Sequence, residues 1–169
     1  MKKLLTLFAF CLMVPAAQAA DPEVFVMPAQ HVLYIKGGAS MEQIGPTLAR
    51  LFPKVGEYVR AHGLTVAGAP LARYHMRPDG TFDIEAGTSI TEANSGEGDV
   101  RYARWPSQRV AHVIHKGALD GLPAAHDMFH KWIRTQGLQI VGDLWEVYLS
   151  DPGNTPADQI LTELVYPVR

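Results

Sequence analysis

The sequence predicts an α+β fold made of two fused copies of a strand–helix–strand–strand unit. The copies would share a mostly antiparallel sheet, with pseudo-two-fold symmetry and a central ligand groove between them. Residues 68–74 match residues 142–148, seventy-four positions later, and residues 60–64 match residues 134–138 at the same offset. Within each copy, the apolar period changes from that of a strand to that of a helix and back again. A repeat of this length usually means one folding unit duplicated and packed against itself.

The first copy is expected to begin with a strand that Pro28 interrupts, since proline cannot donate to a sheet ladder. Ser40 and Gln43 offer a capping box for the helix that follows. Pro53 should kink that helix or mark a second start. Two more strands follow, the second alternating apolar and acidic residues. The expected elements are a strand over 24–35, a helix from 44 to about 63, and strands over 64–76 and 81–86.

A polar segment over residues 87–100 lacks an apolar period and predicts a linker or a flexible flap. The second copy then repeats the order of the first. Its elements are a strand over 108–115, a helix around 122–136, and strands over 142–149 and 159–166. We therefore expect one domain over 20–169, with repeat one at about 22–86 and repeat two at about 101–169.

The first nineteen residues resemble a secretory signal peptide. Lys2 and Lys3 precede an apolar run over residues 4–14, and Ala17-Gln-Ala19 offers a cleavage site. The one cysteine of the chain, Cys11, lies in this segment, so no disulfide is expected afterwards. We expect a periplasmic or secreted protein with no membrane association after cleavage. The formal net charge is −2 and no basic run occurs, which argues against a nucleic-acid partner.

Glu146 is the most informative candidate residue because the aligned position in repeat one is Ala72. Strand alternation places Glu146 with Leu144 and Tyr148 on one apolar stripe, and Trp145 on the other. An ionised, unpaired carboxylate in such a place costs several kcal/mol. An internal ion pair, protonation or a cationic ligand would each relieve that cost. The structural alternative, an internal salt bridge, therefore stays open beside a ligand-facing carboxylate.

Aromatic side chains could surround this carboxylate and attract a lipophilic cation through their ring faces. Tyr74 and Tyr148 are related by the repeat and should face each other across the pseudo-two-fold axis. His115 ends a strand before a glycine turn and is placed at the mouth of the groove. The complete set of candidate ligand-binding residues is Glu146, Tyr148, Trp145, Tyr74, Tyr34, Trp105 and His115.

His126 and His130 are spaced one helical turn apart and flank the apolar stripe of the second helix. We expect both to be surface residues, because no third metal ligand stands nearby in the sequence. His112 and His115 should lie on opposite faces of one strand. The sequence has no glycine-rich phosphate loop, no Cys/His metal spacing and no nucleophile elbow, so we expect neither a metal nor a cofactor.

Several motifs resemble the GyrI-like small-molecule-binding domains, also called the effector-binding domains of AraC-type and MerR-type regulators. The closing segment carries Trp-Glu-Val-Tyr-Leu-Ser-Asp-Pro over 145–152 and Leu-Thr-Glu-Leu-Val-Tyr-Pro over 161–167. The second helix begins similarly, with His-Lys-Gly at 115–117, Leu-Pro-Ala-Ala at 122–125, and Trp132. The resemblance implies a duplicated fold whose groove glutamate, Glu146 here, contacts cationic aromatic ligands. One departure is Gly-Ala-Leu at 117–119, where the family often has Gly-Pro-Tyr.

The resemblance implies a standalone exported member that binds amphipathic, cationic or aromatic small molecules. The length leaves no room for the DNA-binding domain of the regulators, which again argues against a nucleic-acid partner. Two alternatives stay open. Some standalone members resemble hydrolases of strained electrophilic molecules, in which Glu146 would be the general base. The related SOUL fold binds haem, and His126, His130 or His115 would then be the candidate ligands.

Overall fold

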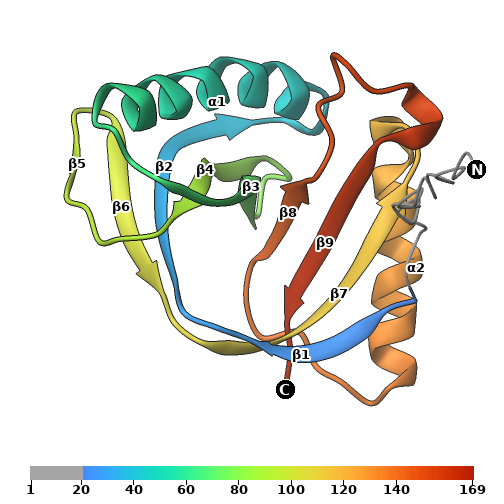
Figure 1. The fold of residues 1–169 in the computed structure, drawn as a ribbon. Coiled ribbons are helices and arrows are strands. Elements are labelled where there is room, and N and C mark those ends of the chain that lie inside the picture. Colours follow the sequence, from blue (N-terminus) through green and yellow to red (C-terminus); the bar gives the residue numbers. More distant parts are fainter. Residues whose placement is uncertain (1–20) are drawn as a thin grey trace, which may run out of the picture.

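A computed structural model describes residues 21–169 as two helices over a single nine-stranded sheet (Figure 1). The expected signal peptide over residues 1–19 lies outside the described residues. Every strand pairing is antiparallel, in the order β1-β7-β9-β8-β3-β4-β2-β6-β5, which confirms the predicted α+β class. No helix within the described part of the chain is both long and apolar enough to cross a membrane.

The strands of the first half are β1 (Glu23–Met27), β2 (Gln30–Ala39), β3 (Val66–Met76), β4 (Phe82–Ile90) and β5 (Gly96–Glu97). Those of the second half are β6 (Val100–Trp105), β7 (Gln108–Lys116), β8 (Leu144–Tyr148) and β9 (Leu161–Pro167). The helices are α1 (Ile44–Ala61) and α2 (Leu122–Thr135), with short 3-10 turns at η1 (Met41–Gln43), η2 (Leu119–Gly121) and η3 (Ala157–Gln159).

The two predicted repeats are the units β2-α1-β3-β4 and β7-α2-β8-β9. Their sheets join where β3 pairs with β8. The strand that precedes each unit crosses over to the other one: β1 pairs with β7, and β6 pairs with β2. At both ends of the sheet, the first strand of one repeat thus pairs with the strand that precedes the other repeat. This is expected for two copies related by a pseudo-two-fold axis.

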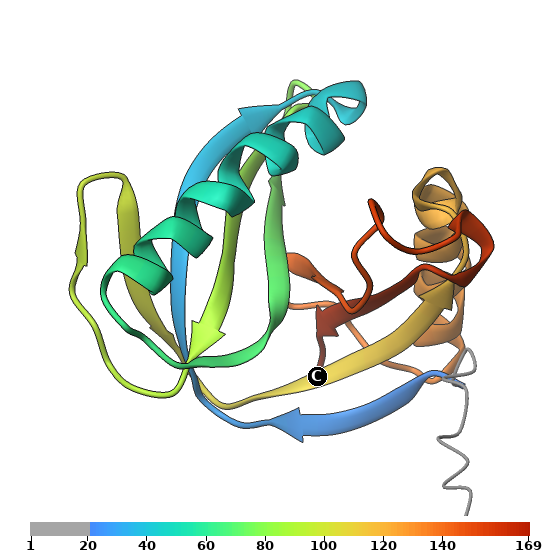
Figure 2. The same ribbon diagram turned by 45° about the horizontal axis from the view of Figure 1, so that its top comes forward.

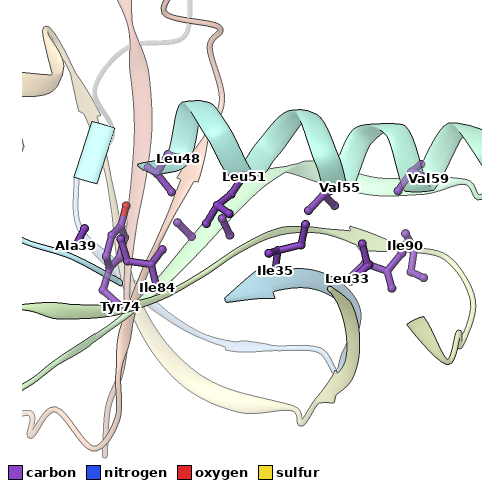
Figure 3. Close-up of a cluster of buried hydrophobic side chains, with 13 residues drawn as sticks. Leu33, Ile35, Ala39, Leu48, Leu51, Val55, Val59, Tyr74, Ile84 and Ile90 are labelled. Carbon is purple, nitrogen blue, oxygen red and sulfur yellow. The ribbon is translucent and has the colours of Figure 1, made fainter. Parts of the chain in front are cut away.

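Both helices pack on the same face of the sheet, called the helical face below, and leave β8 between the regions that they cover (Figures 1 and 2). The inward residues of α1 recur at helical spacing, and adding the repeat offset of seventy-four gives the inward residues of α2. These are Leu48, Leu51, Val55 and Val59 in α1, and Leu122, Ala125, Phe129 and Ile133 in α2. Figure 3 shows the α1 residues facing the strand side chains, with Tyr74 in the same cluster beside Ile84 and Ala39.

The opposite face of the sheet carries a second apolar cluster. Its buried members come from both repeats and from the exchanged strand β6: Val32, Leu71, Trp105, Val110, Trp145 and Val165. The indoles of Trp105 and Trp145 meet edge to face, with ring centroids 5.3 Å apart. The central strands are therefore buried on both faces, as the apolar stripes of β8 predicted.

Two details differ from the sequence predictions. The Ser40 hydroxyl makes no cap hydrogen bond; it donates to the side chain of Glu42 at 2.7 Å, and η1 separates it from the helix. The predicted linker over 87–100 is in part strand, because β4 continues to Ile90 and β5 covers Gly96–Glu97. Polar strand residues hid this, since Thr88 and Ser89 are buried within the sheet rather than exposed in a loop.

Gly87 is required where β4 passes β2, and a matched pair of substitutions tests this. A Cβ at Gly87 would lie 1.9 Å from the Leu33 carbonyl oxygen, whereas one at Gly56 in α1 would meet nothing within 4 Å. We predict that Gly87→Ala destabilises the protein by about 2 kcal/mol or more through overpacking. Gly56→Ala should stabilise it by roughly 0.5–1 kcal/mol, since alanine favours helices. Urea unfolding measures both; equal effects of the two substitutions would contradict the predicted packing.

Candidate functional site

Glu146 lies on the pseudo-two-fold axis of the fold. In the central strand pair, Glu146 of β8 stands directly opposite Ala72 of β3, which is also its equivalent in the other repeat. A residue paired with its own equivalent marks the position of the axis. The carboxylate therefore lies where equivalent residues of the two repeats pair with each other, and the small side chain of Ala72 leaves space for it.

Three side chains donate hydrogen bonds to the Glu146 carboxylate. Oε2 accepts from the hydroxyl of Tyr148 at 2.6 Å and from that of Tyr74 at 3.1 Å. Oε1 lies 2.8 Å from Nε2 of His126. Only 9% of the Glu146 side chain and 16% of the His126 side chain are exposed. The sequence left open how a buried carboxylate would be satisfied, and these contacts give the answer.

Symmetry explains why the two tyrosines converge. Each stands two residues beyond the axis pair, Tyr74 after Ala72 and Tyr148 after Glu146, so both side chains point to the helical face. Their hydroxyl oxygens lie 2.5 Å apart, as expected for equivalent residues that face each other across an axis. The two hydroxyl groups and Oε2 of Glu146 thus form three close oxygen–oxygen contacts with only two hydroxyl protons between them. The carboxylate oxygen is the acceptor that both hydroxyl groups share.

The polar cluster continues from His126 to Tyr166, all within repeat two. The Tyr166 hydroxyl lies 2.8 Å from Nδ1 of His126, and the two rings meet edge to face. The repeat-one equivalent of His126 is Phe52, whose ring packs edge to face on Tyr148 at 5.5 Å. Repeat one thus supplies Phe52 as an apolar wall and Tyr74 as a donor, while repeat two supplies the charge and its other partners, Tyr148 and His126.

Burial holds the phenols of the cluster in their protonated form. The pKa values of Tyr74 and Tyr148 lie well above the ordinary 10.0, first because burial penalises the phenolate. The charge of Glu146 raises the pKa of Tyr74 further, and Tyr74 and then Glu146 raise that of Tyr148. Burial likewise raises the pKa of Tyr166, with a further contribution from Glu146. All three phenols are therefore hydrogen-bond donors at neutral pH, and the site keeps one formal negative charge when His126 is neutral.

The structure brings some of the predicted site residues together and separates others. Tyr74 and Tyr148 join Glu146 as expected. His115 lies on the helical face at the end of β7, where Thr162 of β9 stands between it and Tyr148. Its Nε2 lies 3.3 Å from the Ala118 carbonyl oxygen.

Trp145 and Trp105 belong to the apolar cluster on the opposite face, and Tyr34 packs against it. Strand alternation turns Trp145 away from its neighbour Glu146. These three aromatic residues do not surround the carboxylate. Their predicted contact with a ligand stays a prediction, and they are not included in the site described below.

His126 is the residue that the sequence analysis placed incorrectly. It was expected on the surface beside the apolar stripe, yet it reaches the axis and bonds both Glu146 and Tyr166. The signal for it was the repeat itself, because the offset of seventy-four puts His126 on Phe52, a residue that packs inward. Among the described residues, no group of three or more His, Cys, Asp or Glu side chains is placed to hold a metal ion.

One hollow of the described structure lies away from Glu146. It has a volume of about 340 Å³, and its charged lining comes from Lys36, Arg73, His75, Asp83, Glu85 and Asp143. These charges already neutralise one another: Lys36 pairs with Glu85 at 3.3 Å, and Arg73 with Asp143 at 3.2 Å. An exposed ion pair is a weak interaction in water, and charges that are already paired leave no net charge to attract a charged ligand. We therefore take the buried carboxylate cluster as the candidate site.

Comparisons with known proteins agree with this geometry. The family profile described as GyrI-like small molecule binding domain matches residues 20–169. The crystal structure of the EcmrR C-terminal domain is 21% identical, with a TM-score of 0.77 over 88% of this chain and 97% of that one. The chain spans 57% of EcmrR as seen in its cryo-EM complex with DNA.

Two further structures are similar in fold. SAV2435 bound to tetraphenylphosphonium is 14% identical, with a TM-score of 0.67 over 89% of this chain and 94% of that one. A hydrolase from Listeria innocua is also 14% identical, with a TM-score of 0.61 over 90% of this chain and 94% of that one. At such identities the likeness concerns the fold alone. No curated protein matches the sequence.

The raised phenol pKa values predict how stability changes at alkaline pH. Because the folded-state pKa values of Tyr74, Tyr148 and Tyr166 exceed the unfolded value of 10.0, their contribution is complete below that value and is lost as pH rises above it. Absorbance of tyrosinate at high pH should show these three phenols ionising only with unfolding. Tyr148→Phe should flatten the alkaline loss of stability. Six phenols titrating together near their ordinary pKa in the folded protein would contradict the burial of the cluster.

Proposed function

The chain belongs to the GyrI-like small molecule binding domain family, and from this premise we propose that it binds lipophilic aromatic cations with Glu146 as their charge partner. The observation that carries the proposal is a single carboxylate, 7% exposed, among aromatic side chains on the axis between two repeats. Members of the family bind small molecules. The charge and shape of the ligand are what we add for this chain.

The chemistry around Glu146 suits a delocalised organic cation. A buried negative charge attracts a cation more strongly than an exposed one does, because the low local polarity screens it less. The tyrosine rings and Phe52 offer apolar and π surface for aromatic groups of the ligand. Phe52, Leu144 and Tyr148 are only half-buried, so the covering side chains next to the carboxylate are accessible from the helical face. The tetraphenylphosphonium bound to SAV2435 is a molecule of this class and supports the choice of probe.

Binding is favoured over general-base hydrolysis by the contacts of the carboxylate itself. Both Glu146 oxygens already accept hydrogen bonds, and Oε2 accepts two. Three of the about four lone pairs of the carboxylate are thus occupied, which leaves little capacity to bind and deprotonate a water as a general base must. Both ring nitrogens of His126 are likewise engaged, which leaves none directed at a metal or haem iron. We therefore propose that the protein binds its ligand without hydrolysing it, and that the Glu146 carboxylate holds the cation.

Calorimetric titration with tetraphenylphosphonium tests the proposal. Replacing Glu146 by glutamine removes the charge and keeps the shape, and should weaken binding by about 10- to 100-fold, the worth of one charge-assisted contact of about 1.5–3 kcal/mol. Glu163→Gln is the matched control, since Glu163 lies on the neighbouring strand but bonds His112 on the opposite face. Neutral triphenylphosphine oxide should bind wild type and Glu146→Gln alike. Equal loss of tetraphenylphosphonium affinity in both variants would contradict the role of Glu146.

We further propose that the protein is exported and acts outside the cytoplasm, on the basis of the amino-terminal pattern alone. Expression of the full chain in a Gram-negative host should then give a mature protein that starts close to residue 20, recovered from the periplasmic fraction. Mass spectrometry of the intact protein measures the new terminus. Retention of residues 1–19 in a cytoplasmic product would contradict export without affecting the proposed binding site.

A further inference from the structure

We propose that His126 determines which ligand charge the site accepts, by acting as an internal cation that competes with a cationic ligand for Glu146. Neutral His126 leaves the carboxylate with an uncompensated charge and open to a monocation. Protonated His126 completes an ion pair inside the protein, and the site then favours neutral ligands. This inference rests on the proposed function and adds a residue to it.

The hydrogen bonds fix what His126 does in each state. A carboxylate oxygen can only accept, so Nε2 of His126 carries the proton in the 2.8 Å contact with Oε1. In the neutral ring, Nδ1 is then an acceptor, and the Tyr166 hydroxyl donates to it across 2.8 Å. The neutral tautomer is thus specified from both sides, by Glu146 and by Tyr166.

Tyr166 also supports the charged state without moving. A hydroxyl group both donates and accepts, so a proton on Nδ1 can be donated to the Tyr166 oxygen once that hydroxyl turns. No heavy atom needs to shift for His126 to gain its charge. Histidine is also the side chain that ordinarily changes charge between about pH 5 and pH 8. The Tyr166–His126–Glu146 chain is therefore a bonded path on which one proton can be added or removed.

Few other charges act on this chain. Glu146 and Tyr148 reach it from β8, Tyr74 from β3 and Tyr166 from β9, and the tyrosines are neutral donors. On α2 itself, Asp127 is the adjacent residue and His130 lies one turn further on. Burial, aided by His126 and Arg134, lowers the pKa of His130, which favours its neutral form. Within residues 21–169, Glu146 is the one carboxylate that His126 contacts.

The repeat shows that this arrangement is particular to one half of the molecule. Phe52 occupies the position of His126 in repeat one, and it contacts Tyr148 without adding any charge. A phenylalanine at 126 would therefore preserve the packing that the fold already uses at the equivalent place. The histidine adds a titratable charge beside the ligand carboxylate, and packing alone does not require it.

Titration of tetraphenylphosphonium into the purified protein (residues 20–169) at several pH values tests the inference. Wild-type affinity should fall about tenfold or more from the alkaline to the acidic end of the range in which histidine ordinarily changes charge, about pH 8 to pH 5. At the pH values where the affinity falls, binding should release protons, seen as a dependence of the apparent enthalpy on the ionisation enthalpy of the buffer. Neutral triphenylphosphine oxide should show neither effect.

Two substitutions at 126 separate charge from packing. His126→Gln keeps a donor to Glu146 but can take no charge, so its affinity, whatever its absolute value, should stay constant over the pH range in which the wild-type affinity falls. His126→Phe copies repeat one and should also lose the pH dependence, which covers the case of one variant failing to fold. His130→Gln is the control on the same helix and should keep the wild-type profile.

The outcomes distinguish this inference from the function on which it rests. A wild-type pH profile in both His126 variants would overturn the role of His126 while leaving Glu146 as the charge partner. If only His130→Gln lost the pH dependence, the competing charge would belong to His130, and the role proposed for His126 would again be overturned. Absence of tetraphenylphosphonium binding at every pH, in all variants, would instead reject the proposed function.

Discussion

The candidate site depends on a single carboxylate placed where two equivalent strands meet. A residue on a pseudo-two-fold axis faces its own equivalent across the central strand pair, with Cβ atoms about 5 Å apart. Two glutamates there would repel each other inside the protein, so only one repeat can carry the charge; the other has Ala72. The same symmetry brings Tyr74 and Tyr148 to one oxygen of Glu146. Duplication thus supplies two matching donors, and one departure from the repeat supplies the acceptor.

From that point the two halves differ in chemistry while keeping the same packing. The inward apolar residues of α1 and α2 correspond one to one, so either helix covers its part of the sheet in the same way. The differences gather on the helical face near the axis, where Phe52 corresponds to His126. Buried ionic clusters are weak contributors to stability, because apolar side chains of similar volume can usually replace them. Folding alone therefore does not require the cluster around Glu146, and the proposed binding of a cation gives it a role.

Much of this architecture could be predicted from the sequence, because the repeat and the strand and helix periods are local signals. The offset of seventy-four aligned Glu146 with an alanine and predicted that Tyr74 faces Tyr148. Period two also predicted that Trp145 points away from Glu146, although it does not show which distant aromatics share a face. Tyr34 and Trp105 reach the opposite face through strand register, which depends on pairings across the whole chain. His126 could not be found from its helix alone, since its partners lie on β8 and β9. Polar residues in β4 concealed that the segment after residue 86 continues the sheet.

The most direct test of the central claim is a crystal structure of the protein with tetraphenylphosphonium. Phosphorus scatters X-rays more strongly than carbon and therefore marks the position of the cation. Our account predicts the phosphorus on the helical face between α1 and α2, within about 6 Å of a tyrosine ring beside Glu146. His126 or a tyrosine hydroxyl would then have changed its contact with the carboxylate. A cation bound instead in the hollow lined by Asp83, Glu85 and Asp143, with the Glu146 cluster unchanged, would contradict the account.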